Sequence, residues 1–279
     1  MVCFVAMFLT VASSGIVSAA SYQDNVLYVD NDWSSGTSPA ELTWGENAFV
    51  SIGNAVDNAD SLENNKVKVF AGIYDDSLET FPITVDVEGL ELIAENGPDE
   101  TLVDVNDDTK DGFFLDTYDD MTLAGFTVTD VNNAFVLDIY SSNNVLENNV
   151  AQNYNWIGFN VKSESNNNTL ENNWAQNPYS NGYDGFYFSS SSNNTLVNNR
   201  AQNNGYNGFV FNSSSNNVLE NNVAQNNSDG FSFDSSSNNL LENNLAEKNN
   251  RGFHIYSSDN VVMRNNSLLN NDYNFGVEG

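Results

Sequence analysis

The sequence predicts an all-β solenoid, in which short coils of chain stack on one another. Two spacings predict it: a leucine slot recurs at steps of 24, 26, 23, 22 and 22 residues, and a glycine slot at steps of 27, 23, 22 and 22. Repeats of roughly 20 to 50 residues are typical of solenoids. The leucine slot holds Leu146, Leu170, Leu196, Leu219, Leu241 and Met263, and the glycine slot holds Gly158, Gly185, Gly208, Gly230 and Gly252.

The residues after each glycine alternate as in a β-strand. Phe186 and Phe188, for example, fall on one face of an extended chain, with a variable residue between them. One leucine per repeat is too few for a leucine-rich repeat. Asn, Ser and Gly fill the segments between apolar runs, and these residues tolerate tight turns and left-handed backbone. Each repeat is therefore predicted to be one coil with two or three short strands.

Stacking such coils places equivalent residues about 4.8 Å apart, so that each slot becomes a ladder. An alanine ladder is predicted at Ala151, Ala175, Ala201, Ala224 and Ala246, and an asparagine ladder at Asn149, Asn173, Asn199, Asn222, Asn244 and Asn266. Stacked amide side chains bond to the copies above and below them. We therefore expect these asparagines to hold the fold and to do no chemistry.

The Asn-rich repeats resemble those of the right-handed parallel β-helix family, and more narrowly of NosD-type and other carbohydrate-associated, pectin lyase-like β-helix proteins. The phrases Met121-Thr-Leu-Ala-Gly-Phe-Thr-Val128 and Gly89-Leu-Glu-Leu-Ile93 resemble earlier coils of that family, and Leu27 to Tyr74 resembles its N-terminal cap and first coil. The likeness covers residues 26 to 279. It implies the fold, but the same scaffold hosts lyases, hydrolases, epimerases, binding modules and structural spikes.

Residues 1–20 read as a signal peptide, because an apolar run is followed by small residues that permit cleavage after Ala19 or Ala20. No Lys or Arg precedes the apolar run, which departs from the usual pattern. The only cysteine, Cys3, lies in this segment, so the mature chain has no thiol for a disulfide, a nucleophile or a metal site. We expect an extracellular or cell-surface protein.

Residues 21–279 are predicted to form a single β-helix domain. Residues 21–81 would be the N-terminal cap and first coil, and apolar residues at helical spacing in 48–59 predict a short helix that closes this end. Residues 83–140 would form irregular coils separated by Asp-rich corners, and residues 143–279 the regular Asn-rich coils.

The last coil is predicted to be open. Asn274 to Val277 begin another aromatic strand, and the sequence stops two residues later. An open coil would present unpaired backbone, which favours association through its edge. We expect either that the sequence is a fragment or that a partner covers this coil.

The charge is strongly acidic. Eight Lys and Arg residues stand against 38 Asp and Glu residues, a net charge of −30. This excludes nucleic acid and anionic membrane surfaces as partners, because both require a basic face. Many carboxylates with few lysines are typical of proteins adapted to high salt, where screening reduces self-repulsion. We predict a halophilic protein.

A row of acidic residues follows the leucine slot. It holds Glu147, Glu171, Val197, Glu220, Glu242 and Arg264, and it is expected to face outward. Carboxylates about 5 Å apart repel one another, so cations should stabilise them. Two interpretations stay open: a solvated face neutralised by bulk ions, or a weak calcium site at Glu147 and Glu171. No other cofactor is predicted.

The longest repeat, between Leu170 and Leu196, carries an aromatic loop before Gly185. Exposed aromatic rings among amides suit sugars, which present apolar faces and hydroxyl groups. The alternative is that these rings pack beneath their own loop. The predicted glycan-binding residues are Tyr154, Trp156, Trp174, Tyr179, Tyr183, Tyr187 and Tyr206.

A second function class, a polysaccharide lyase or glycosidase, would act in the aromatic groove near Tyr179 to Asp184. Asp184 and Asp229 lie two coils apart, about 9.6 Å by the stacking distance, near the separation of the carboxyls in inverting glycosidases. Arg251 occupies the same slot, and the lone His254 is expected at an outward strand position. The catalytic motifs of polygalacturonases, pectate lyases and alginate epimerases are missing. The favoured prediction is therefore a non-catalytic protein that binds a polysaccharide or cell-surface glycan, or builds a cell envelope.

Overall fold

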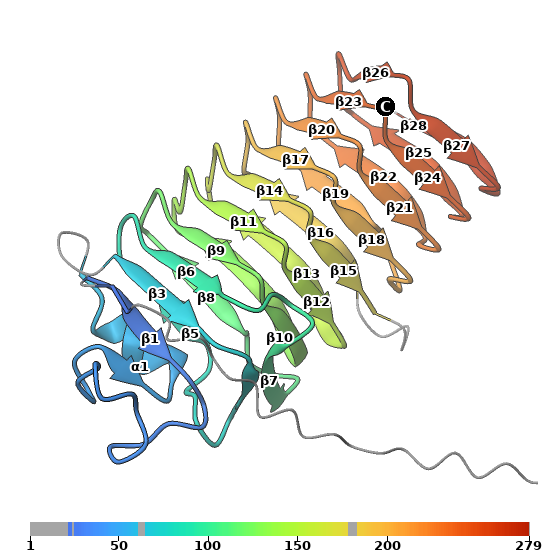
Figure 1. The fold of residues 1–279 in the computed structure, drawn as a ribbon. Coiled ribbons are helices and arrows are strands. Elements are labelled where there is room, and N and C mark those ends of the chain that lie inside the picture. The colour runs from blue at the N-terminus through green and yellow to red at the C-terminus, as the bar shows by residue number, and fades with distance from the viewer. Residues whose placement is uncertain (1–21, 24, 61–64, 178–182, 279) are drawn as a thin grey trace, which may run out of the picture.

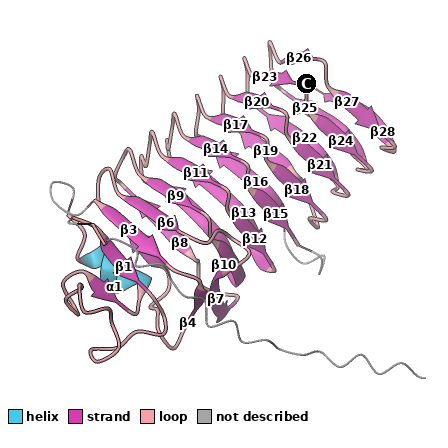
Figure 2. Ribbon diagram, in the orientation of Figure 1, coloured by secondary structure: helices cyan, strands magenta, loops and turns pink. Residues whose placement is uncertain are grey.

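The computed structural model describes residues 22–23, 25–60, 65–177 and 183–278. They form a right-handed parallel β-solenoid whose coils stack along one axis (Figure 1). Strands repeat in the same order from coil to coil, and the helix lies at the N-terminal end (Figure 2). The predicted fold class is confirmed. The proposed signal peptide and Tyr179 lie outside the described residues.

The first sheet contains the leucine ladder and is called the leucine sheet. It has 11 strands, all paired in parallel. In spatial order they are β2 (Ala48–Phe49), β1 (Leu27–Val29), β3 (Lys66–Val69), β6 (Glu91–Ala94), β9 (Thr122–Ala124), β11 (Val145–Glu147), β14 (Thr169–Glu171), β17 (Thr195–Val197), β20 (Val218–Glu220), β23 (Leu240–Glu242) and β26 (Val262–Arg264).

The other strands form two parallel ladders. The alanine sheet contains β4 (Gly72–Asp75), β7 (Thr101–Asp107), the first part of β10 (Thr127–Asp138), β12 (Val150–Gln152), β15 (Trp174–Gln176), β18 (Arg200–Gln202), β21 (Val223–Gln225), β24 (Leu245–Glu247) and β27 (Ser267–Leu269). The phenylalanine sheet contains β5 (Ile83–Val85), β8 (Phe113–Asp116), the rest of β10, β13 (Tyr154–Lys162), β16 (Asp184–Ser189), β19 (Phe209–Asn212), β22 (Asp229–Asp234), β25 (Arg251–Tyr256) and β28 (Tyr273–Glu278). β10 pairs in both ladders and so joins them.

Asn-Asn pairs turn the chain at the corners of the regular coils. At one corner Asn198 is left-handed with φ 56°, and Asn199 after it is fully buried. Asparagine tolerates this backbone better than most residues, which explains the first position of the pair. The second position meets the need to satisfy buried backbone groups at a turn.

The buried asparagines form hydrogen-bonded rows along the axis. Asn199 Oδ1 accepts from the backbone N–H of Asn173 at 2.9 Å, and its Nδ2 donates to the carbonyl of Leu170 at 2.7 Å. The predicted row from Asn149 to Asn266 is confirmed, and the described residues contain two more. These are Asn144, Asn168, Asn194, Asn217 and Asn239, and Asn204, Asn227, Asn249 and Asn271.

Stacked phenylalanines fill the interior. The rings of Phe159 and Phe186 lie 4.7 Å apart with their planes at 5°, and those of Phe186 and Phe209 are also 4.7 Å apart. These rings and the predicted alanine ladder are fully buried. Each coil therefore buries apolar surface only against its neighbours, as in other solenoids.

The N-terminal end contains α1 (Ile52–Asp57), which packs against β1, β2, β3 and β5. The buried carboxylate of Glu79 accepts from the N–H of Ile52 at 2.5 Å and from the N–H of Gly53 at 3.0 Å. These bonds satisfy N–H groups that a helix start leaves unpaired. The capping role predicted for a helix here stays a prediction.

The coil nearest the C-terminus exposes apolar side chains. Tyr273 is 65% exposed, Phe275 55% and Val277 74%. Association through this coil stays a prediction. Over the described ranges, the structure contains no helix with the length and hydropathy to cross a membrane.

Candidate functional site

A row of polar side chains on the phenylalanine sheet occupies the slot before four of the five repeat glycines, and Ile157 occupies the slot before Gly158. This polar row consists of Asp184, Asn207, Asp229 and Arg251. The glycines are required here: a Cβ on Gly208 would lie 2.7 Å from the carbonyl oxygen of Gly230 and 3.0 Å from the buried Ala224 Cβ. A side chain at the glycine position would point into the packed interior. The polar side chains therefore occupy the preceding position, on the outer rim of the phenylalanine sheet.

Hydrogen bonds join the members of the polar row. The backbone N–H and Nδ2 of Asn207 both donate to Asp184 Oδ1, at 2.9 Å each. The N–H of Asp229 donates to Asn207 Oδ1 at 3.2 Å. The two predicted catalytic carboxyls are thus linked through an amide.

The carboxylate of Asp229 forms an ion pair with Arg251. Arg251 donates from Nε and Nη2 to the two carboxylate oxygens of Asp229, at 2.7 and 2.8 Å. His254 Nδ1 lies 3.3 Å from Asp229 Oδ2, and the Asp229 side chain is only 4% exposed. Hydrogen bonding to Asp229 raises the pKa of Arg251. A paired, buried carboxylate of this kind is not free to activate water.

Asp184 is in a different state. Burial raises its pKa to about 6, against the opposing effect of the two hydrogen bonds from Asn207. Loss of hydration disfavours the charged carboxylate more than the hydrogen bonds favour it. Asp184 is therefore the member of the polar row that exchanges a proton near neutral pH.

Three exposed rings stack beside the polar row, in three successive coils, each ring two residues before the repeat glycine of its coil. This aromatic stack consists of Trp156, Tyr183 and Tyr206. Trp156 and Tyr183 have ring centroids 4.8 Å apart, and Tyr183 and Tyr206 are 4.7 Å apart. Their exposed fractions are 49%, 38% and 54% respectively. Tyr183 is sandwiched, so the two end rings each keep one face without a ring partner among the described residues.

The other predicted aromatic residues lie elsewhere. The prediction that Tyr154 offers an exposed ring is wrong: it is 1% exposed, and its hydroxyl bonds to Asn204 Oδ1. It is the first residue of β13, and its ring turns inward, where that amide satisfies its hydroxyl. Tyr187 is half-buried on the outer side of β16, between Asn160 and Val210.

Trp174 lines a separate groove on another face. A groove of about 610 Å³ runs between the 95–99 loop and the coils that carry Val150 and Trp174. The guanidinium of Arg200 lies 5.4 Å from the centroid of the Trp174 ring. Because this ring already stacks with a cation, it is less available for a sugar than the aromatic stack.

A polar pocket of about 520 Å³ lies beside the start of β13, and the lining residues include Tyr154 and Asn155 but not Trp156. Asn155, which precedes Trp156, lines it and donates from Nδ2 to the carbonyl of Asp108 at 3.5 Å. Asp107, Asp108 and Asp130 supply carboxylates to the same pocket. Sequence reasoning did not predict these three as site residues. They occur in irregular coils, where only the Asp-rich corners gave a signal.

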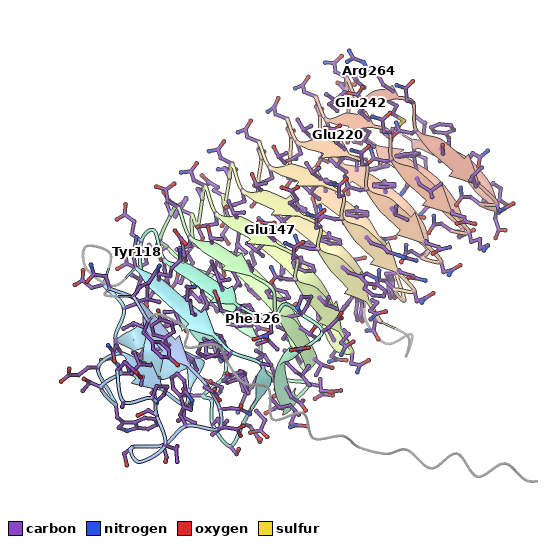
Figure 3. All side chains as sticks on the ribbon, viewed as in Figure 1. Tyr118, Phe126, Glu147, Glu220, Glu242 and Arg264 are labelled. Carbon is purple, nitrogen blue, oxygen red and sulfur yellow. The ribbon has the colours of Figure 1, made fainter. Side chains whose placement is uncertain are left out.

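The acidic row crosses the leucine sheet at the C-terminal ends of its strands. Figure 3 labels four of its members, Glu147, Glu220, Glu242 and Arg264, and strand pairing places Glu147 beside Glu171. In the part of the chain that the structure describes, no group of three or more His, Cys, Asp or Glu side chains is arranged to hold a metal ion. The calcium site at Glu147 and Glu171 stays a prediction.

Comparison with known proteins identifies the fold. Residues 176–278 match the family model described as "Right handed beta helix region". A search of curated proteins found no significant match.

Among solved structures, pectate lyase Pel9A is similar with 17% identity and a TM-score of 0.60, over 85% of this chain and 76% of that one. The A-module of mannuronan C-5 epimerase AlgE4 from Azotobacter vinelandii is 18% identical with a TM-score of 0.55, over 72% and 68% of the two chains. The catalytic domain of a GH87 α-1,3-glucanase in complex with nigerose is 16% identical with a TM-score of 0.55, over 78% and 43%. At this identity the likeness shows the fold alone: the chain has the right-handed parallel β-helix architecture of these proteins.

Proposed function

We propose that this is a secreted or cell-surface β-helix protein that binds a glycan without cleaving it, at the Trp156 end of the aromatic stack. The single observation that carries the proposal is the row of three exposed, mutually stacked rings on a rigid sheet. Solvent-exposed aromatic surface of this extent is costly to maintain, and it is typical of a binding site. The solved structures with this fold are named for action on polysaccharides or for a bound sugar, which supports the same ligand class.

The geometry of the stack determines how a sugar would bind. Each ring covers the face of its neighbour, so Tyr183 has no free face. A sugar ring would therefore pack its apolar side on the face of Trp156 or of Tyr206 that has no ring partner among the described residues. Trp156 offers the larger ring, and the residue before it, Asn155, lines the polar pocket, where the Asn155 side chain and carboxylates would pair with sugar hydroxyls.

The rigidity of the stack favours binding. Tyr183 N–H donates to the carbonyl of Trp156, and Tyr206 N–H to that of Tyr183, both at 2.8 Å. These bonds fix the main chain, and the rings also stack on one another, so they lose little conformational freedom when a ligand binds. A preformed platform therefore uses most of its contact energy for affinity.

Truncation of the stack tests the proposal. Trp156→Ala combined with Tyr206→Ala should weaken binding to the preferred polysaccharide by at least about tenfold, measured by affinity electrophoresis across a polysaccharide panel. Tyr118→Ala is the matched control, because Tyr118 is 43% exposed and follows β8, whereas the stack lies where the strands of the phenylalanine sheet begin; Figure 3 labels Tyr118. Thermal melting should change little in either variant. Equal affinity in the double variant and the parent would contradict the proposal.

Polysaccharide cleavage is the second candidate function, and one observation favours it. A carboxyl with a pKa of about 6, as at Asp184, suits a general acid at neutral pH. The partner carboxyl is the weakness, because Asp229 is held by Arg251. Shortening of a polymer by the parent protein but not by Asp184→Asn, followed by size-exclusion chromatography, would replace the binding proposal with this one.

Export is part of the proposal and is tested separately. If residues 1–20 direct secretion, mass spectrometry of the exported protein should find a mature chain that begins at Ala20 or Ser21. Retention of the intact N-terminus inside the cell would contradict export.

A further inference from the structure

We infer that the glycan bound at the aromatic stack is neutral, and that the site discriminates against polyuronates. The inference rests on the proposed function and specifies its ligand class. Mannuronan and pectate, for which the similar epimerase and lyase are named, are polyanions. The charges around this site lead to a different expectation for this chain.

The polar pocket that Asn155 lines, next to Trp156 in the chain, is acidic. Asp107, Asp108 and Asp130 line it, and its other lining residues are asparagines and Tyr154. Asp108 and Asp130 are exposed, so a ligand seated on Trp156 would approach their carboxylates. A sugar carboxylate placed here would meet like charge, whereas a sugar hydroxyl would find hydrogen-bond acceptors.

Lys110, which lies beside the pocket, and Arg251, which lies four coils from Trp156 in the polar row, are both paired with carboxylates. Lys110 Nζ lies 3.7 Å from Asp107 Oδ2, and Arg251 makes two short bonds to Asp229. Both cations are therefore already compensated by carboxylates. Recognition of a uronate normally uses a free cation, above all an arginine that binds the carboxylate with two bonds.

The electrostatic field of the whole molecule also acts against an anionic ligand. With a net charge of −30, the chain repels a polyanion before contact, which lowers its association rate. This repulsion is screened within about 10 Å at 0.1 M salt. Binding of a neutral glycan by stacking and hydroxyl contacts should depend little on salt, so salt separates the two modes.

The experiment measures affinity for two sets of oligosaccharides of matched length. One set is neutral and contains glucans, xylans, mannans and galactans; the other contains alginate and polygalacturonate oligomers. At 50 mM NaCl we expect the best neutral ligand to bind at least about tenfold more tightly than any uronate, with little change at 1 M NaCl. Tighter binding of a uronate would overturn the inference and leave the proposed function intact. Failure of every glycan to bind would overturn the proposed function itself.

A charge variant tests whether the pocket is responsible. Asp108→Asn with Asp130→Asn removes two carboxylates, and asparagine suits the left-handed backbone at position 130, where φ is 53°. The matched control is Glu220→Gln with Glu242→Gln, which makes the same charge change at the C-terminal ends of two leucine-sheet strands (Figure 3). We expect at least threefold tighter uronate binding at 50 mM NaCl in the pocket variant only. An equal gain in both variants would mean that overall charge, and not this pocket, sets the preference.

Discussion

The corners of the coils and the outer rim of the phenylalanine sheet are built from the same repeat, but they differ in how completely their polar groups are used. At the corners each buried asparagine repeats the bonds of the one below it, as in the row through Asn199 and Asn222. On the rim the slot changes from coil to coil: Asp184, Asn207, Asp229 and Arg251 each make different bonds. Uniform slots therefore hold the solenoid together, and slots that depart from the repeat mark candidate functional residues.

The largest effect should follow from breaking a corner. Asn199→Ala removes the acceptor for Asn173 N–H and the donor to the Leu170 carbonyl, both buried. Each unsatisfied buried group costs about 1–3 kcal/mol, so we expect a loss of about 3–5 kcal/mol in the free energy of unfolding. Denaturant unfolding followed by circular dichroism measures it.

The neighbouring position supplies the control for that change. Asn198→Gly alters the exposed, left-handed residue of the same corner, and glycine accepts this backbone. We expect a change of less than about 1 kcal/mol. Similar losses for both substitutions would mean that the corner, and not the asparagine row, carries the stability.

A smaller effect should come from the rim. Asp184 has a raised pKa in the fold, so its contribution to stability is full below its ordinary pKa and is lost as pH rises through about 6. Asp184→Asn keeps an oxygen that accepts from Asn207. It should therefore raise stability by up to about 3 kcal/mol at pH 8 and leave it unchanged near pH 3. Melting curves at both pH values test this, and a variant that is less stable at pH 8 would show that the charged form is favoured.

The smallest effect is expected in the acidic row, at the C-terminal ends of the leucine-sheet strands, where the carboxylates have no buried partners among the described residues. Glu220 and Glu242 are register neighbours, and like charges opposite one another are destabilising. Glu242→Gln should therefore raise stability by roughly 0.5 kcal/mol at low salt and by less in molar salt. The parent protein should melt at a higher temperature in molar salt, as predicted for a halophilic protein. A melting temperature that does not depend on salt would contradict that prediction.

Much of the fold could be predicted from the sequence because the repeat exposes it. The alternation of Phe186 and Phe188 correctly predicted a buried face, and the spacing of Asn199 and its equivalents predicted a hydrogen-bonded row. The other two asparagine rows have the same Asn-Asn signature. They were missed because the interior position of a corner depends on backbone conformation, which the residue type alone leaves open.

The site was predicted less completely. Trp156, Tyr183 and Tyr206 were predicted to bind a glycan, which stays a prediction, and the structure brings them together in one stack. Tyr154 was placed wrongly, because its burial depends on Asn204 two coils away. Spacing along the chain does not report such contacts, nor does it report the pairing of Arg251 with Asp229 across adjacent coils.

Binding of a glycan at the Trp156 end of the aromatic stack can be tested by hydroxyl-radical footprinting with and without the best oligosaccharide. We expect the ligand to lower the oxidation of Trp156 most and that of Tyr206 or Tyr183 less, while Trp174 and Tyr118 stay unchanged. Protection of Trp174 with an unprotected Trp156 would place the ligand in the 95–99 groove and contradict the claim.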